Sequence, residues 1–298
     1  MPTLCLGEAL VDLVCERPVK DLAQADTFRP HFGGAVANVA ITAASHGAGV
    51  RLAGGAGDDP WGRWLRDRLA AAGVGLDHFR LIPNRATPIA LVTVRPDGEP
   101  RFQIYGDGIT ATLEAVADDL PQAVATAEAL FFSSNTLAGR RERELTLAAR
   151  DRALELGRPV LFDPNLRLHR WISASAAVAE ANRCVPGALL VRCNRTEAKL
   201  MTGEPDPDRA AEALLAGGAR IVVVTLGPDG ALLRGKGRAH APGRPARVVS
   251  TVGAGDAFTA VLLAHLARAG FDPAAAPAAL PEAVRESARA TERWGAVE

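Results

Sequence analysis

Cysteine, aromatic residues and clustered histidines are all scarce in this 298-residue chain. The four cysteines, Cys5, Cys15, Cys184 and Cys193, form no Cys-x-x-Cys pair and no spacing typical of a zinc site. The six histidines are isolated, and no His-Glu-x-x-His pattern occurs. These absences argue against a zinc enzyme and against a disulfide-stabilised secreted protein, and they favour a reducing cytoplasm.

An excess of charge of either sign is also absent. Lys and Arg together number 34, as do Asp and Glu, and no run of five or more basic residues occurs. We therefore expect no nucleic-acid partner and no membrane surface as a partner. No apolar stretch reaches about 18 residues without charge, so no membrane-spanning helix is expected. The chain enters a strand-like run at residues 3–6 without the basic start of a secretory leader, which again predicts a cytoplasmic protein.

The pattern of apolar residues indicates an α/β protein. Residues 4–6 and 50–54 are expected strands, and residues 35–45 are an expected helix. From about Leu113 strands and helices alternate, which predicts a parallel sheet with helices on both faces. The strands are expected at 129–133, 159–163, 188–192 and 220–226, and the helices near 139–156, 173–183, 194–215 and from 273 to the end.

A second, smaller sheet is expected from segments that are distant in the sequence. Short strands are indicated at 9–14, 81–82, 88–94 and 101–105, with Pro96-Asp97-Gly98 as a hairpin turn. Because two separated segments contribute to it, this sheet is expected to form a flap over a site.

The stretch Gly253-Ala254-Gly255-Asp256 is the main chemical signal. It follows Val248 and Val249 and precedes an apolar, helix-forming run. Small residues at a helix start leave backbone N–H groups open to an anion such as phosphate. A carboxylate beside such an anion site suits a proton acceptor. The alternative is a plain glycine turn in which Asp256 only caps the helix.

Other polar residues lie at expected strand ends or helix starts. Gly33, Gly34 and Asn38 form a glycine-rich junction with a helix, and Asp12 interrupts an apolar strand. A plain loop and an exposed strand position are the alternatives there. The expected parallel strands end in three polar clusters, where α/β sheets bind ligands: 163–167, 194–197 and 225–230. Residues 230–237 resemble a P-loop, but Ser or Thr is missing after Lys236 and a hairpin suits them better.

Taken together, these motifs resemble the ribokinase-like sugar kinases of the phosphofructokinase-B type along nearly the whole chain. Four segments match in the order of that family: 33–38, 194–197, 225–230 and 251–256. The segments 7–12 and 163–167 look most like the fructokinase branch. The resemblance implies a ribokinase-like three-layer sandwich, a single domain over residues 1–298. It has a central, mainly parallel sheet and a discontinuous β lid from about 9–32 and 76–106.

The resemblance also implies roles for individual residues. Asp256 would be the catalytic base, and Gly253, Ala254 and Gly255 would stabilise the transferred phosphoryl group with their N–H groups. Glu197, with Asn194, would hold Mg²⁺ through water. The ATP-binding residues would be Asn165, Asn194, Thr225, Gly227, Gly230 and Gly255, and the sugar-binding residues would be Asp12, Gly33, Gly34, Asn38, Tyr105 and Arg167.

Two departures from the family pattern affect the expected specificity. Ser250 stands where the family usually has Asp in a region that binds a monovalent cation, so dependence on potassium is in doubt. Gly106 stands where relatives often carry an arginine, which argues against an acidic sugar and weakens the case for fructose. A homodimer through the lid is a further expectation from the family.

We therefore expect an ATP-dependent kinase of a small sugar, with fructose as the first candidate. Ribose, another hexose, 2-keto-3-deoxygluconate and a nucleoside are alternatives, although the few aromatic residues do not indicate a pocket for a base. A non-catalytic sugar or nucleotide sensor on the same fold is the second class. A Rossmann dehydrogenase is excluded because no Gly-x-Gly-x-x-Gly follows the first strand.

Overall fold

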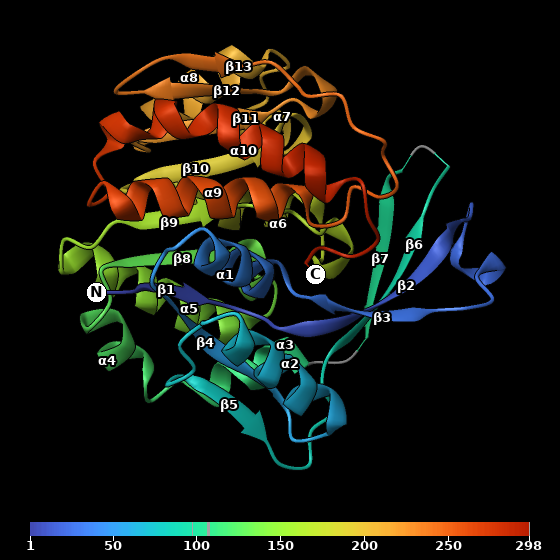
Figure 1. Ribbon diagram of the computed structural model, residues 1–298. Helices are drawn as coiled ribbons and strands as arrows, with labels where there is room; N and C mark the ends of the chain where they lie inside the picture. Colours follow the sequence, from blue (N-terminus) through green and yellow to red (C-terminus); the bar gives the residue numbers. More distant parts are fainter. Residues whose placement is uncertain (97, 106–107, 298) are drawn as a thin grey trace.

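A large, mainly parallel sheet forms the centre of the molecule (Figure 1). The computed structural model describes residues 1–96, 98–105 and 108–297. Within these residues the sheet has nine strands, and only β12 and β13 run antiparallel to their neighbours. In spatial order the strands are β13 (Ala239–Ala241), β12 (Ala231–Gly235), β11 (Ile221–Thr225), β10 (Leu190–Asn194), β9 (Val160–Asp163), β8 (Ala129–Ser133), β1 (Thr3–Leu6), β4 (Val50–Gly57) and β5 (Phe79–Ile82).

Helices cover both faces of this sheet. Because successive strand residues point to opposite faces, Phe131 packs into one core and Phe132 into the other. One face is covered by α1 (Ala35–Ser45), α2 (Pro60–Ala71), α9 (Ala254–Arg268) and α10 (Ala276–Ala290). The other is covered by α3 (Gly108–Glu114), α4 (Leu120–Ala125), α5 (Arg140–Glu155), α6 (Ala174–Arg183), α7 (Arg195–Thr202) and α8 (Pro207–Ala216).

A separate four-stranded sheet projects from one side of the large sheet (Figure 1). Its order is β3 (Arg29–Gly33), β2 (Leu10–Pro18), β6 (Ile89–Val94) and β7 (Pro100–Tyr105). One face buries an apolar cluster that includes Leu10, Val14 and Val92, together with Val252 and Ala296 from the body. The fold therefore matches the expected α/β architecture with a central sheet and a small β lid.

Several boundaries differ from the expectations. Strand β5 pairs with β4 in the large sheet, so the second lid segment begins at β6 and not near residue 76. The helix expected over 194–215 is divided into α7 and α8, because Gly203 adopts a φ of 79° and Asp206 caps a new helix that starts at Pro207. Strand β4 continues to Gly57, beyond the expected end at residue 54.

The end of the chain also differs from the expected continuous helix. Helix α10 ends at Ala290, and the following residues return to the start of α9, where Ala296 lies against Gly253. Trp61, in the first turn of α2, is 39% exposed. The hairpin turn expected at 96–98 includes Asp97, which is outside the described residues, but β6 and β7 do pair antiparallel.

No helix in the described parts of the chain is both long and apolar enough to cross a membrane. All four cysteines are buried and free.

Candidate active site

A cleft of about 1380 Å³ lies where the strands of the large sheet end and the lid begins. It is lined by residues of both sheets and by the start of α9. Fourteen of the predicted site residues line it: Asp12, Gly34, Asn38, Asn165, Arg167, Asn194, Glu197, Thr225, Gly227, Gly230, Gly253, Ala254, Gly255 and Asp256. The structure thus gathers residues from six separate stretches of sequence into one cleft.

The glycines at the start of α9 are required by close packing. Gly253, the N-cap, has a φ of 76°, and a Cβ there would lie 2.3 Å from Cβ of Ala296. A Cβ on Gly255 would lie 2.8 Å from Nη1 of Arg192. The first N–H groups of any helix have no partner within the helix, and the helix dipole adds positive potential there. This end of the cleft is therefore suited to an anion.

Asp256 lies in the first turn of α9, partly buried at the cleft. Asn38, in the first turn of α1, donates a hydrogen bond from Nδ2 to Oδ2 of Asp256 at 2.8 Å. Burial raises the pKa of Asp256 to about 6, while the hydrogen bond from Asn38 lowers it and the charge of Asp163 raises it again. The carboxylate is thus ionised near neutral pH and able to accept a proton.

Asp12 lies on β2 of the lid and is 3% exposed. Burial raises its pKa to about 8, and the negative charges of Asp256 and Glu8 raise it as well. Gly33 does not line the cleft, but a Cβ there would lie 2.5 Å from Cγ of Asp12. Gly33 therefore makes room for the Asp12 side chain on the neighbouring strand.

Arg167 connects the body to the lid. Its guanidinium carbon lies 4.8 Å from the centre of the Phe102 ring on β7, in a cation–π contact. The charge of Arg167 lowers the pKa of both Asp12 and Asp256. Arg167 therefore faces the acidic end of the cleft and supplies positive charge there.

The structure also reveals a buried charge network that the sequence did not predict. Arg192, 8% exposed, donates from Nη1 to Oδ2 of Asp163 at 3.1 Å and from Nη2 to Oγ1 of Thr225 at 2.9 Å. Thr259 of α9 donates to the same Asp163 oxygen at 2.8 Å. The one sign of this network in the sequence was that Arg192 interrupts an apolar strand. This network ties β9, β10, β11 and α9 together close to Gly255 at the start of α9.

Glu197 and Asn194 form a reciprocal capping box at the start of α7. Oδ1 of Asn194 accepts from the backbone N of Glu197 at 2.9 Å, and Oε2 of Glu197 accepts from the backbone N of Asn194 at 2.9 Å. Oε1 of Glu197 accepts from the backbone N of Leu166 at 2.8 Å. Burial, and then the charge of Asp163, raises the pKa of Glu197. Glu197 thus fixes the local backbone while its carboxylate still lines the cleft.

The loop after β11 forms the opposite end of the cleft. Thr225 ends the strand, and Gly227 and Gly230 have φ values of 63° and 94°. A Cβ on Gly230 would lie 2.0 Å from the carbonyl oxygen of Ala241, so only glycine fits. Strands β12 and β13 that follow form an antiparallel hairpin, which agrees with the rejection of a P-loop at 230–237.

Asn165 also lies at the cleft, in a left-handed conformation with a φ of 38°. Its backbone N donates to Oδ1 of Asp163 at 3.1 Å, and its Nδ2 is buried with no hydrogen-bond partner among the described residues. A ligand acceptor in the cleft would satisfy this group.

Tyr105 is not brought to the cleft. It is 50% exposed and lines a separate cavity of about 440 Å³ with Pro88 and Gly108. Alternate residues of β7 face opposite sides, so Phe102 and Ile104 pack against the apolar cluster while Tyr105 faces away. This placement does not support the predicted role of Tyr105 in sugar binding. Gly106, which stands where relatives often carry an arginine, lies outside the described residues.

Ser250, the other departure from the family pattern, is fully buried shortly before the start of α9. Its Oγ accepts from the backbone N of Val252 at 3.2 Å, and its own N donates to the carbonyl oxygen of Thr291 at 3.2 Å. The serine thus completes a local turn with neutral hydrogen bonds.

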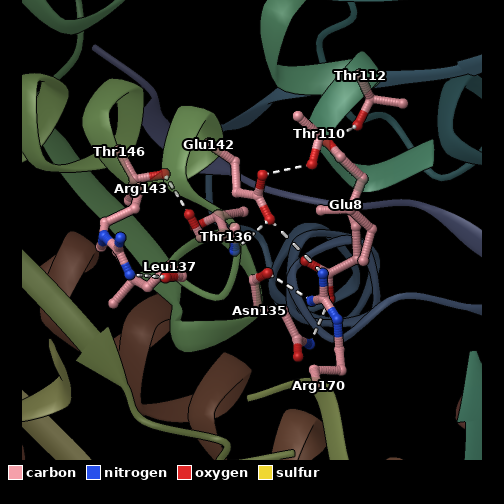
Figure 2. A network of polar contacts seen from close by, with 12 residues as sticks. Glu8, Thr110, Thr112, Asn135, Thr136, Leu137, Glu142, Arg143, Thr146 and Arg170 are labelled. Atoms are coloured by element: carbon pink, nitrogen blue, oxygen red, sulfur yellow. Dashed lines mark hydrogen bonds and ion pairs between the residues drawn. The ribbon is translucent and has the colours of Figure 1, made fainter. Parts of the chain in front are cut away.

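A second polar network lies beside the acidic end of the cleft (Figure 2). Oε1 of Glu8 accepts from Nδ2 of Asn135 at 2.9 Å, and Nη1 of Arg170 donates to the carbonyl oxygen of Asn135 at 2.5 Å. Arg170 also lies 3.7 Å from Oε1 of Glu142, and Thr110 donates to the other oxygen of Glu142. Glu8 and Asn135 line the cleft, although neither was predicted to be a site residue.

The model of the pfkB family carbohydrate kinases matches residues 3–290, and the chain belongs to that family. Probable fructokinase-7 of Arabidopsis thaliana is 33% identical over 270 residues, which cover 89% of this chain and 78% of the relative.

Two solved structures of enzymes with bound ligands are similar over nearly their whole length. Fructokinase from Vibrio cholerae O395, bound to fructose, ADP and a calcium ion, is 28% identical, with a TM-score of 0.83 and coverage of 99% of this chain and 94% of that one. Aminoimidazole riboside kinase from Salmonella enterica, bound to aminoimidazole riboside and an ATP analogue, is 30% identical, with a TM-score of 0.82 and coverage of 99% and 95%.

Proposed function

We propose that this carbohydrate kinase transfers the γ-phosphate of ATP to a hydroxyl group of a small neutral sugar, with fructose as the first candidate. The observation that carries this proposal is the position of Asp256. The carboxylate is hydrogen-bonded to Asn38, has a raised pKa and lies in the first turn of a helix whose N-terminus is suited to phosphate.

In the proposed reaction, Asp256 accepts the proton of the attacking hydroxyl as the new O–P bond forms and the bond to ADP breaks. The N–H groups of Gly253, Ala254 and Gly255 stabilise the charge on the transferred group. Phosphoryl transfer depends mainly on positioning and electrostatic stabilisation, so this pairing of a base with an anion site suits the chemistry.

The other end of the cleft would hold the nucleotide. Thr225, Gly227 and Gly230 would line ATP, with Asn165 and Asn194 near its phosphates. A divalent cation fits here because Glu197 lines the cleft and each of its oxygens, although it already accepts one backbone N–H, can accept a further hydrogen bond from a metal-bound water. The described residues contain no cluster of three or more acidic, cysteine or histidine ligands. Mg²⁺, which retains much of its water, would therefore be held through water and phosphate.

The sugar would bind between the lid and the start of α1. Asp12 and Asn38 would bind its hydroxyl groups, Gly34 would allow close approach of the backbone, and Arg167 would face the transferred phosphate. The four-stranded sheet would exclude water from the reacting groups as a lid on one ribokinase-like unit. A cytoplasmic location and a dimer through the lid remain predictions from the sequence.

Fructose is preferred because of the fructokinase relatives, and aminoimidazole riboside is the second candidate because a similar structure binds it. The test is ATP consumption with Mg²⁺ against fructose, ribose, glucose, mannose, 2-keto-3-deoxygluconate, adenosine, inositol and aminoimidazole riboside. We expect one neutral sugar to dominate kcat/KM. Binding of ATP without turnover on any of them would favour the sensor hypothesis instead.

A further inference from the structure

Glu8 lies where the chain passes from β1 of the large sheet to β2 of the lid, and it is 1% exposed. Its Oε1 accepts two hydrogen bonds, from the backbone N of Ala35 at 3.0 Å and from Nδ2 of Asn135 at 2.9 Å. Its Oε2 is equally buried, and no polar group of the described chain donates to it. A buried carboxylate oxygen without a donor is costly, so the cleft that Glu8 lines is the expected source of one.

Two other acceptors lie at the same end of the cleft. Oδ1 of Asn38 is also buried without a partner among the described residues, and Asp12 contributes a carboxyl group. The charge of Glu8 raises the pKa of Asp12, which indicates that the two carboxyl groups lie within electrostatic reach of each other. Hydroxyl groups can donate to the oxygens of all three residues, whereas a substrate carboxylate brings no donor and would be repelled by the charge of Glu8.

The position of Glu8 is fixed by its hydrogen-bond partners. Asn135 links Glu8 to Arg170, because its Nδ2 donates to Glu8 and its carbonyl oxygen accepts from Arg170 (Figure 2). The charges of Glu8 and Glu142 both raise the pKa of Arg170 against the effect of burial. Arg170, which does not line the cleft, therefore offsets the charge of Glu8 without a hydrogen bond to Oε2.

We propose that Glu8 binds the acceptor sugar and selects neutral, hydroxyl-bearing substrates. Its Oε2 accepts a hydrogen bond from a sugar hydroxyl other than the one that is phosphorylated, and Asn135 and Arg170 are positioning residues for it. This inference rests on the proposed sugar kinase function.

Glu8→Gln tests it, because the amide keeps the shape and presents a donor where the free oxygen was. We expect the KM for the sugar to rise about ten- to hundred-fold, since a hydrogen bond to a charged group is lost, while the KM for ATP stays within about two-fold. Relative kcat/KM on 2-keto-3-deoxygluconate should rise. Among deoxy analogues of the sugar, the one that lacks the hydroxyl bound by Glu8 should suffer no further loss from the substitution.

Glu142→Gln is the matched control. Glu142 is also 1% exposed and belongs to the same network, but it does not line the cleft. We expect it to lower thermal stability and to leave the KM for the sugar unchanged. A rise in that KM with Glu142→Gln equal to the rise with Glu8→Gln would show a structural effect only and would overturn the proposal.

The remaining outcomes are also decisive. An unchanged sugar KM in folded Glu8→Gln overturns the role of Glu8 but leaves the kinase function intact. Should Glu8→Gln fail to fold, Glu8→Asp keeps the charge and withdraws the carboxylate by one methylene; a raised sugar KM supports the proposal, and an unchanged one overturns it. Absence of turnover by the unmodified enzyme on every sugar overturns the proposed function, and this inference with it.

Discussion

Asn38 and Asp256, which are 218 residues apart in the chain, are joined by a hydrogen bond of 2.8 Å from Nδ2 to Oδ2. The two residues lie in the first turns of α1 and α9, which pack against each other on one face of the sheet. The bond fixes the direction of the carboxylate and favours its ionised form. It thus links the proposed sugar-binding segment directly to the proposed base.

Asp256→Asn should preserve the fold and the hydrogen-bonding shape of this pair while removing the proton acceptor. We expect kcat to fall by about 10²- to 10⁴-fold, the range typical of general-base catalysis, with sugar and ATP binding nearly intact. Steady-state kinetics and calorimetric titration of both ligands would measure this. Asp67→Asn, on an exposed face of α2, is the matched control. Turnover within a few-fold of the unmodified enzyme would remove Asp256 as the base.

Activity should depend on pH through the same carboxylate. A base must be deprotonated, so kcat/KM should rise with pH and level off above the pKa of Asp256, about 6. The bond from Asn38 lowers that pKa, and its removal in Asn38→Ala should therefore move the acid limb to higher pH. A pH profile of both proteins would measure the shift. A limb that stays in place, or that moves to lower pH, would contradict the assigned interaction.

The sequence predicted the residues that local chemistry makes conspicuous. Gly253 and Asp256 lie in a small-residue helix start, and Asn38 follows a glycine pair, so each could be placed at a site before any fold was known. Their contact could not be predicted from spacing, since it depends on how α1 and α9 pack. The prediction that these residues share one site came from the resemblance to a family.

Arg192 shows why other site residues were missed. A charged residue within an apolar strand is compatible with an exposed strand position, and its partners Asp163 and Thr225 lie on neighbouring strands. Only the parallel register brings the three together. Similarly, the short apolar run at 79–82 fits either sheet, and pairing with β4 decides between them. The break between α7 and α8 was predictable, because Asp206 and Pro207 are a typical helix start.

Asp12 should lower stability as the pH rises. Its folded-state pKa of about 8 lies above the usual value of about 3.9 in unfolded chains. Between these two pH values the folded state keeps the proton and the unfolded chain loses it, so the free energy of unfolding falls as the pH rises. We expect Asp12→Asn to raise Tm by about 3 °C or more at pH 9, to make little difference at pH 4, and to raise the KM for the sugar far more than that for ATP. Calorimetric melting across this pH range is the measurement. The same gap in Tm at both pH values would contradict the pKa.

Arg192 should stabilise the fold by compensating Asp163. Arg192→Met leaves a buried carboxylate without its ion-pair partner, and we expect a loss of about 3–5 kcal/mol in the free energy of unfolding. In an Asp163→Asn background the same substitution should cost clearly less, because no charge is left uncompensated. Urea denaturation of the four proteins gives this cycle. Equal costs in both backgrounds would show that the pair does not interact.

Ser250→Asp tests the expectation that the charge missing at this position affects dependence on potassium. Ser250 is fully buried among neutral hydrogen bonds, so an aspartate there would be a buried charge that needs a cation. We therefore expect the variant to be less stable than the unmodified enzyme in choline chloride, and to gain both Tm and kcat on titration with potassium chloride. Ser250→Asn, which adds similar bulk without charge, is the control and should not respond to potassium. Activation of the unmodified enzyme by potassium, with no response to potassium in the aspartate variant, would show that the cation site does not depend on this residue.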